Sequence, residues 1–403
     1  MAALAEARVQ GKVTIVRRLS LIVTLLAIGL PLPLTVLARS IPVDRMRGLL
    51  SPPLIDNAEP PSRPALRLAT WQRGEFQRGF EPWFASIVVP RGWSVRLTNQ
   101  LYYSLFARSY MVGGTIIVGR EHYLYQRDDL HAYCESARGD GTMVTPLVDE
   151  VRELRNLLAR RGHPLLFVVS PSKAVTMREF LPADLCRWPV APDRPRRLLV
   201  EKLREAGVPV IDGPDLVREM KARDPLPPFL RGSVHWSQVA GERVAGVLLE
   251  EVRVLTGTDL GELTLGSPRW TASPTGTDRD FAELLNLLRP PLDYPTGVAA
   301  PICRPTVSGH EARLVAVGDS FLITVLDPIG ACGLFKEVDL YFYYTLAHMR
   351  WPGGREPVDR AKLRWRKTLD MAAVTVVEIN EVAIDHDVPY LHQFLDDAIA
   401  ALR

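Results

Sequence analysis

Cysteine is scarce in this sequence: four of the 403 residues are cysteine, and no two of them form a C-x-x-C pair. Structural zinc sites usually draw their ligands from such close pairs, so this spacing argues against zinc. The chain also has no glycine-rich P-loop, and we expect neither a metal nor another cofactor. Two disulfides in any of three pairings, or free buried thiols, remain open for Cys134, Cys186, Cys303 and Cys332.

A surplus of charge is missing from most of the chain. The net charge is +3, and residues 1–18, with four basic side chains against one acidic, account for all of it. Nucleic-acid-binding domains carry clustered Lys and Arg on their folded part. The balanced remainder therefore argues against nucleic acid as a partner.

One long uncharged run, residues 19–38, stands out near the N-terminus. As a helix rising about 1.5 Å per residue it would just span a ~30 Å hydrocarbon core. The basic segment before it favours an uncleaved anchor, whereas Pro31 and Pro33 fit a cleaved signal peptide. Both interpretations export the rest of the chain. We expect a cytoplasmic tail (1–18), an inner-membrane anchor or signal segment (19–38), a proline-rich spacer (39–65) and a periplasmic domain (66–403).

Residues 66–125 are rich in aromatic side chains and end in an alternating stretch that predicts a hairpin, so we expect a layer packed on the main domain. From residue 145 onward, short apolar runs alternate with amphipathic segments. Buried strands are predicted at 165–169, 208–211, 313–317 and 374–379, and helices at 145–158, 194–206, 214–222 and 238–253. This alternation predicts an α/β fold with a doubly wound, three-layer αβα sheet, whose ligand crevice lies at the carboxyl ends of the strands.

Ser320 follows a predicted buried strand in the sequence Gly318, Asp319, Ser320, Phe321. A serine at such a strand-to-helix turn is exposed and has free backbone N–H groups beside it, which suits a nucleophile. A helix cap is the more common role of so short a motif.

A base for this serine is available in His235, which lies between Val234 and Trp236 just before a predicted helix start at Ser237. A neutral imidazole can take a hydroxyl proton near pH 7 and return it to a leaving group. A single loop histidine often has no such role, so the pairing with Ser320 is a hypothesis.

These motifs together resemble those of the alginate O-acetyltransferase (AlgJ and AlgX) family of SGNH-hydrolase-like proteins. The resemblance covers roughly residues 66–400 and depends on the order of its short motifs: Gly119 to Tyr125, Pro171 to Lys173, His235-Trp236, Gly318 to Phe321, and Glu378 to Glu381. In that family the histidine precedes the serine, as it does here. The resemblance implies an SGNH-hydrolase-like fold, an acyl-enzyme mechanism, a polysaccharide acceptor and a membrane-bound O-acyltransferase partner.

The sequence departs from the family pattern at one position. The pattern reads Asp-x-His-Trp, and Ser233 replaces the aspartate. A hydroxyl can orient an imidazole but cannot offset its charge. Either another acid helps a Ser320–His235 dyad, with Asp385, Asp387 and Glu381 as candidates by position, or the domain only binds.

Four further residues are candidates at the site. Asp319 is expected to hold the turn by backbone hydrogen bonds, and Asn380 matches the asparagine that donates to the oxyanion, although a turn role is as plausible. Lys173 could bind a sugar carboxylate, and Tyr343 could stack on a sugar ring.

The sequence therefore predicts a membrane-anchored periplasmic O-acetyltransferase acting on an exopolysaccharide. An acetyl esterase would use the same covalent chemistry, and a non-catalytic carbohydrate-binding or scaffold subunit is the alternative suggested by Ser233.

Overall fold

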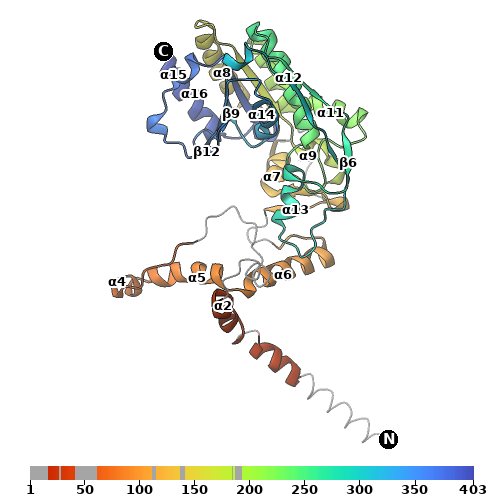
Figure 1. Ribbon diagram of the computed structural model, residues 1–403, viewed down its shortest axis with the longest axis vertical. Helices are drawn as coiled ribbons and strands as arrows, with labels where there is room; N and C mark the ends of the chain where they lie inside the picture. The colour runs from red at the N-terminus through yellow and green to blue at the C-terminus, as the bar shows by residue number, and fades with distance from the viewer. Residues whose placement is uncertain are drawn as a thin grey trace, which may run out of the picture. The chain divides into compact units, whose positions relative to one another are not determined.

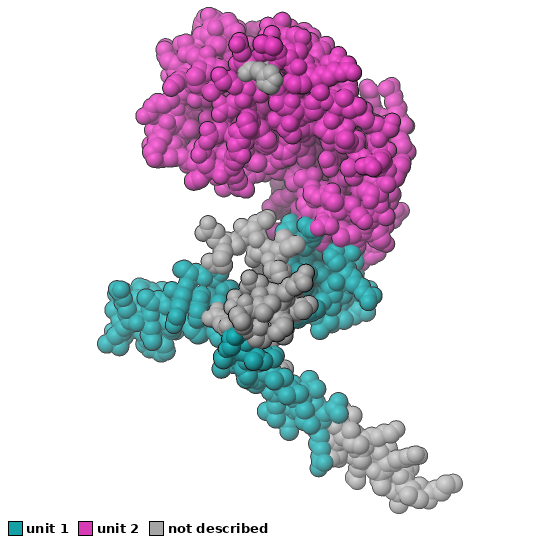
Figure 2. All heavy atoms as spheres, in the orientation of Figure 1, with its two compact units in different colours: residues 1–106, 283–290 teal, residues 107–282, 291–403 magenta. Residues whose placement is uncertain are grey.

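The computed structural model describes residues 17–26, 29–40, 61–110, 115–136, 141–183, 185–186 and 193–403. The predicted tail 1–18 and spacer 39–65 lie mostly outside these residues. The described chain forms two compact units, one from residues 1–106 and 283–290 and the other from 107–282 and 291–403 (Figure 2).

The first unit is helical. Its helices are α2 (Pro31–Ser40), α4 (Leu68–Gln72), α5 (Glu75–Ile87) and α6 (Pro90–Phe106). Arg17–Leu37 is the helix in the described residues that is long and apolar enough to cross a membrane, with a mean hydropathy of 2.2. A signal sequence has the same properties, so both interpretations of this segment stand. The aromatic-rich stretch 66–125 divides at Phe106, because its helices belong to this unit and its hairpin to the second.

The second unit contains a seven-stranded mixed sheet in the order β12-β11-β10-β9-β13-β3-β4. Strands β10, β9, β13, β3 and β4 run parallel, whereas β11 and β12 add an antiparallel edge. The strands are β3 (Leu165–Ser170), β4 (Val210–Asp212), β9 (Arg313–Gly318), β10 (Glu337–Phe342), β11 (Ala347–Trp351), β12 (Arg355–Glu356) and β13 (Val374–Asn380).

Helices cover both faces of this sheet, which gives three layers (Figure 1). One face is covered by α8 (Val144–Ala159), α10 (Asp193–Glu205), α15 (Trp365–Asp370) and α16 (Pro389–Leu402), and the other by α11 (Gly213–Arg223), α12 (Gln238–Thr256) and α14 (Phe321–Ala331). Three short elements lie outside these two layers: α7 (Arg127–Ser136), α9 (Lys173–Thr176) and α13 (Asp280–Leu284). Along β3, Leu165, Phe167 and Val169 pack against α8, α10 and α16, while Leu166 and Val168 pack against α12 and α14. A strand buried on both faces needs this continuously apolar sequence, and the predicted α/β architecture is confirmed.

Three two-stranded sheets complete the second unit. The predicted hairpin is present as β1 (Ile116–Val118) and β2 (Leu124–Gln126). The other pairs are β5 (Glu262–Leu265) with β8 (Pro301–Arg304), and β6 (Arg269–Thr271) with β7 (Thr296–Val298). Two disulfides join Cys134 to Cys186 and Cys303 to Cys332, which selects one of the three possible pairings.

Candidate active site

The turn that carries Ser320 connects β9 to α14 at the carboxyl edge of the sheet. Ser320 is the residue before α14, and the N–H of Phe321 donates to Asp319 Oδ1 at 2.8 Å. The N–H of Asp319 donates to Glu378 Oε2, also at 2.8 Å. A Cβ at Gly318 would lie 2.5 Å from that same oxygen, so only glycine allows β9 to approach Glu378 this closely. The turn is thus fixed from β13, and Asp319 has the turn-holding contacts expected of it.

His235 lies against this serine. Its Nε2 is 2.7 Å from Ser320 Oγ, and its Nδ1 is 2.6 Å from Asp280 Oδ2. The imidazole ring also packs edge-on against Phe321, with ring centroids 5.2 Å apart. The two segments that the sequence paired across 85 positions therefore meet, and a carboxylate completes a Ser-His-Asp chain of hydrogen bonds.

Asp280 is an acid that was not predicted from the sequence. Its Oδ1 accepts hydrogen bonds from the N–H of Val234, at 3.0 Å, and from its neighbour Phe281, at 2.6 Å. These contacts orient the carboxylate so that Oδ2 faces the imidazole. Asp280 lies 45 residues after the histidine, at the first residue of the short helix α13, where no local motif pointed to it.

Ser233 does not orient the histidine ring. Its hydroxyl donates to the backbone carbonyl of His235 at 2.9 Å, and the side chain is fully buried. Ser233 therefore stabilises the loop backbone, while Asp280 takes the place beside Nδ1. The acids suggested by sequence position are also not the partner: His235 Nδ1 bonds Asp280, and Glu381 Oε1 accepts from the N–H of Ser172.

Lys173 holds the loop that carries His235. Its ammonium group donates to the carbonyl oxygens of Leu230, Arg231 and Ser233 at 2.7, 3.0 and 2.6 Å. It also lies 5.2 and 5.3 Å from the ring centroids of Tyr123 and Tyr125. Because Lys173 is only 2% exposed, the prediction that it binds a sugar carboxylate is wrong, and its role is to fix the loop.

Asn380 is occupied by structural contacts. Its Nδ2 donates to Ser170 Oγ and to the carbonyl of Pro171, both at 3.2 Å, and its Oδ1 accepts from the N–H of Val382. The turn role fits these contacts, and the oxyanion role does not, because both amide hydrogens have protein acceptors.

Tyr343 comes directly after β10, which pairs with β9 so that Phe342 lies opposite Gly318. Its N–H donates to the Gly318 carbonyl at 2.8 Å, and its φ of 42° is a left-handed value that a tyrosine rarely adopts. Its hydroxyl interacts with the Ser320 side chain, and burial raises the pKa of Tyr343. Tyr343 thus stays protonated near neutral pH and places a hydroxyl beside the serine.

Several carboxyl groups surround the serine turn. Burial raises the pKa of both Asp319 and Glu378, and Glu378 Oε1 is 2.5 Å from Ser170 Oγ. Burial also raises the pKa of Asp129, on α7, to about 7, and the charge of Asp319 adds to this effect while that of His235 opposes it. Several carboxyl groups with raised pKa values therefore lie near the serine turn. Within the described ranges, no group of three or more His, Cys, Asp or Glu side chains could hold a metal ion.

Glu381 leads to a prediction on stability. It is 3% exposed, and burial raises its pKa to about 8, against the lowering effects of the Ser172 N–H and the Arg196 charge. In the unfolded chain this carboxyl loses its proton near pH ~4.3, so between these values only the unfolded state is ionised and stability falls by up to about 1.4 kcal/mol per pH unit. We expect Glu381→Gln to remove this loss. The free energy of unfolding of the variant should therefore increase relative to that of the wild type as pH rises.

Urea unfolding at roughly pH 5, 6.5 and 8 measures this effect. Glu205→Gln, at the exposed end of α10, is the control and should behave as the wild type does. The prediction would be contradicted if the difference in free energy of unfolding between Glu381→Gln and the wild type stays constant across the three pH values.

Residues 116–297 match the family model described as "SGNH hydrolase-like domain, acetyltransferase AlgX". The matched residues include β3 and β4 of the seven-stranded sheet, whereas its other strands come after residue 297. The match includes His235 and Asp280 and ends before Ser320, and it confirms the resemblance seen in the sequence. No curated protein matches the chain in sequence.

Solved structures are also similar to this chain. The O-acetyltransferase domain of Pseudomonas putida AlgJ is 18% identical, with a TM-score of 0.45 over 70% of this chain and 98% of that one. Pseudomonas aeruginosa AlgX is 15% identical, with a TM-score of 0.45 over 71% and 66% of the two chains. A DHHW family protein from Eubacterium siraeum is 11% identical, with a TM-score of 0.41 over 63% and 89%.

Proposed function

We propose that this protein is an O-acetyltransferase that uses Ser320 as nucleophile, His235 as general base and acid, and Asp280 as the carboxylate that orients and charge-balances the histidine. The observation that carries the proposal is the chain of contacts from Ser320 Oγ to His235 Nε2, at 2.7 Å, and from His235 Nδ1 to Asp280, at 2.6 Å. The match to an acetyltransferase domain supports the acyl group and the class of reaction.

In the first half-reaction, Ser320 Oγ attacks the carbonyl carbon of an acetyl donor while His235 Nε2 takes the hydroxyl proton. The tetrahedral intermediate then collapses, the proton passes to the leaving group, and acetyl-Ser320 remains. The negative charge of Asp280 stabilises the imidazolium that forms in between. The Ser320 N–H and the Tyr343 hydroxyl are the donors we assign to the oxyanion.

In the second half-reaction, a hydroxyl of the acceptor attacks the acetyl carbonyl and gives its proton to His235. Collapse of this intermediate returns the proton to Ser320 Oγ and releases the acetylated acceptor. We propose a polysaccharide as the acceptor, since the motifs of the sequence resemble those of the alginate O-acetyltransferase family. An esterase would differ only in using water here.

The proposal of a non-catalytic subunit was motivated by the missing aspartate at position 233. Asp280, at the start of α13, supplies that carboxylate, so the missing aspartate no longer favours a non-catalytic subunit. The acyl-enzyme function is therefore the one we retain.

We further propose that this reaction occurs outside the cytoplasm, at a membrane. The apolar helix candidate Arg17–Leu37 supports export by an anchor or a signal sequence, and two disulfides are typical of an oxidising compartment. A membrane-bound acyltransferase that delivers the acetyl group remains a proposal from the resemblance.

Labelling with a fluorophosphonate tests the nucleophile. We expect covalent labelling of the wild type and none of Ser320→Ala, because only an activated serine attacks the phosphorus centre. Ser308→Ala, at an exposed serine, is the control and should label fully. Incubation with p-nitrophenyl acetate and a mannuronate hexasaccharide then separates acetylated sugar, the transferase product, from free acetate.

Two outcomes contradict the nucleophile assignment. One is a wild type that does not label, and the other is a Ser320→Ala variant that labels at the wild-type rate. Free acetate as the main product, with no acetylated sugar, would reassign the protein as an esterase with the same Ser320 chemistry.

A further inference from the structure

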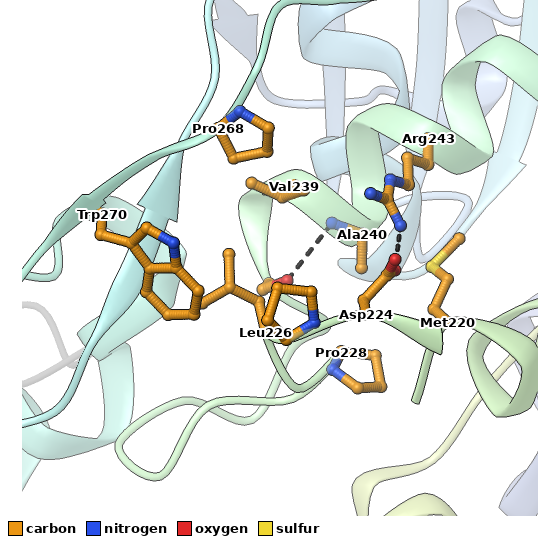
Figure 3. Close-up of a pocket in the computed structure, with 11 residues that line it drawn as sticks. Met220, Asp224, Leu226, Pro228, Val239, Ala240, Arg243, Pro268 and Trp270 are labelled. Carbon is orange, nitrogen blue, oxygen red and sulfur yellow. Dashed lines mark hydrogen bonds and ion pairs between the residues drawn. The ribbon is translucent and has the colours of Figure 1, made fainter. Parts of the chain in front are cut away.

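A small cavity lies behind the histidine loop, between the start of α12 and the β6–β7 pair (Figure 3). Its volume is about 150 Å³. Pockets that enclose drug-sized ligands hold roughly 300–1,000 Å³, so this one suits a single ring rather than a longer molecule.

The two ends of the cavity differ in chemistry. Figure 3 shows Trp270 at one end and the ion pair of Arg243 with Asp224 at the other, with Leu226 and Val239 between them. Trp270 is 53% exposed, which leaves ring surface available for contact. At the far end, the one hydrogen bond between Arg243 and Asp224 leaves guanidinium donors and carboxylate lone pairs unused among the described contacts.

Prolines and a capped helix turn form much of the cavity wall. Pro225, Pro228 and Pro268 form part of its rim, and Val239 and Ala240 belong to the first turn of α12, which Ser237 caps through the Ala240 N–H. Gly297, opposite Trp270 on β7, allows the close packing, because a Cβ there would lie 2.3 Å from Leu226 Cδ1. A preformed shape of this kind reduces the entropy lost when a ligand binds.

The same loop builds this cavity and carries the catalytic histidine. Pro228 lines the cavity, and its carbonyl accepts the N–H of Ser237 at 2.6 Å, closing a loop in which Phe229 bridges to Trp236. His235 lies within that loop. A ligand held in the cavity would therefore be held by the element that positions the base.

We propose that this cavity, the Trp270 pocket, is a carbohydrate subsite that binds one pyranose ring of the acceptor polysaccharide. This proposal rests on the proposed function. It extends that function by naming a place where the polymer binds, apart from the acceptor hydroxyl that receives the acetyl group. A pyranose has an apolar C–H face, which matches the tryptophan ring, and an edge of hydroxyls that both donate and accept hydrogen bonds. The adjacent Arg243 and Asp224 offer the complementary donor and acceptor, and their charges cancel.

Binding of a mannuronate hexasaccharide, measured by calorimetry on Ser320→Ala and on the wild type, tests the subsite. We expect Trp270→Ala to raise the Kd and the KM for the hexasaccharide by about tenfold or more, with kcat and the rate of fluorophosphonate labelling unchanged. Asp224→Asn should weaken binding in the same direction. Trp71→Ala removes an exposed tryptophan of the helical unit and should bind as the wild type does.

The proposal is overturned if Trp270→Ala binds the hexasaccharide as tightly as the wild type, or if the wild type does not bind it. It is also overturned if Trp270→Ala changes only the reaction with p-nitrophenyl octanoate, since the cavity would then hold an acyl chain. Failure of the proposed function is distinguishable, because it would show as absent Ser320 labelling while hexasaccharide binding still depends on Trp270.

Discussion

Asp280→Asn is expected to lower kcat by about 10⁴-fold while leaving the fold intact. The asparagine amide can occupy the same space, but it cannot offset the charge of the imidazolium, and it favours the wrong tautomer of His235. Asp280 is the residue to change because its Oδ2 lies 2.6 Å from His235 Nδ1. Initial rates of acetyl transfer and the rate of fluorophosphonate labelling measure the effect.

Asp385→Asn and Asp387→Asn are the matched controls, since both residues were candidates for this role by sequence position. We expect both to retain wild-type rates. The double variant Ser233→Asp with Asp280→Asn tests whether an aspartate at position 233, where the family pattern has one, can replace Asp280. Because the Ser233 side chain bonds to the His235 carbonyl rather than facing its ring, we expect no recovery. Recovery to within tenfold of the wild type would contradict the assignment of Asp280.

Lys173→Met is expected to lower the free energy of unfolding by about 3–5 kcal/mol and to reduce kcat strongly. Three N–H donors are needed for the three carbonyls that Lys173 Nζ contacts, and methionine supplies none. Burial lowers the pKa of Lys173, whereas the charge of Asp280 opposes that shift. The variant leaves buried carbonyls without donors and releases the loop that positions His235.

Urea unfolding and acetyl-transfer rates measure the two effects of this change. Lys221→Met is the control, because Lys221 also donates to a carbonyl, that of Thr176, but lies at the surface beside Glu179. We expect it to cost less than about 1 kcal/mol. An equally small cost for Lys173→Met, with activity retained, would show that the loop is held by other contacts.

The sheet could be predicted from the sequence because its strands are buried on both faces. Short continuous apolar runs such as Leu165 to Val169 and Leu314 to Val317 are typical of strands buried on both faces, and they form most of β3 and β9. The antiparallel edge of β11 and β12 was not predicted, because Ala347–Trp351 is only partly buried and Arg355–Glu356 is exposed. The division of the aromatic-rich stretch at Phe106 also has no composition shift to mark it.

The site could be predicted only where its chemistry lies next to a strand end or a helix start. Ser320 and His235 lie beside such recognisable elements, and the structure brings them together. Asp280 and the loop-fixing role of Lys173 depend on long-range packing, which no local spacing encodes. A lysine after a strand gives no sign in the sequence that Leu230, Arg231 and Ser233 will turn their carbonyls toward it.

The separation of Asp280 from the histidine bears on how inactive relatives are recognised. A survey that counts a chain as degenerate when the Asp-x-His-Trp signature is broken would discard this one, although a carboxylate at the start of a helix 45 residues downstream reaches the imidazole. Surveys of such chains should look for a carboxylate near the imidazole in the structure rather than for an aspartate two residues before the histidine in the sequence.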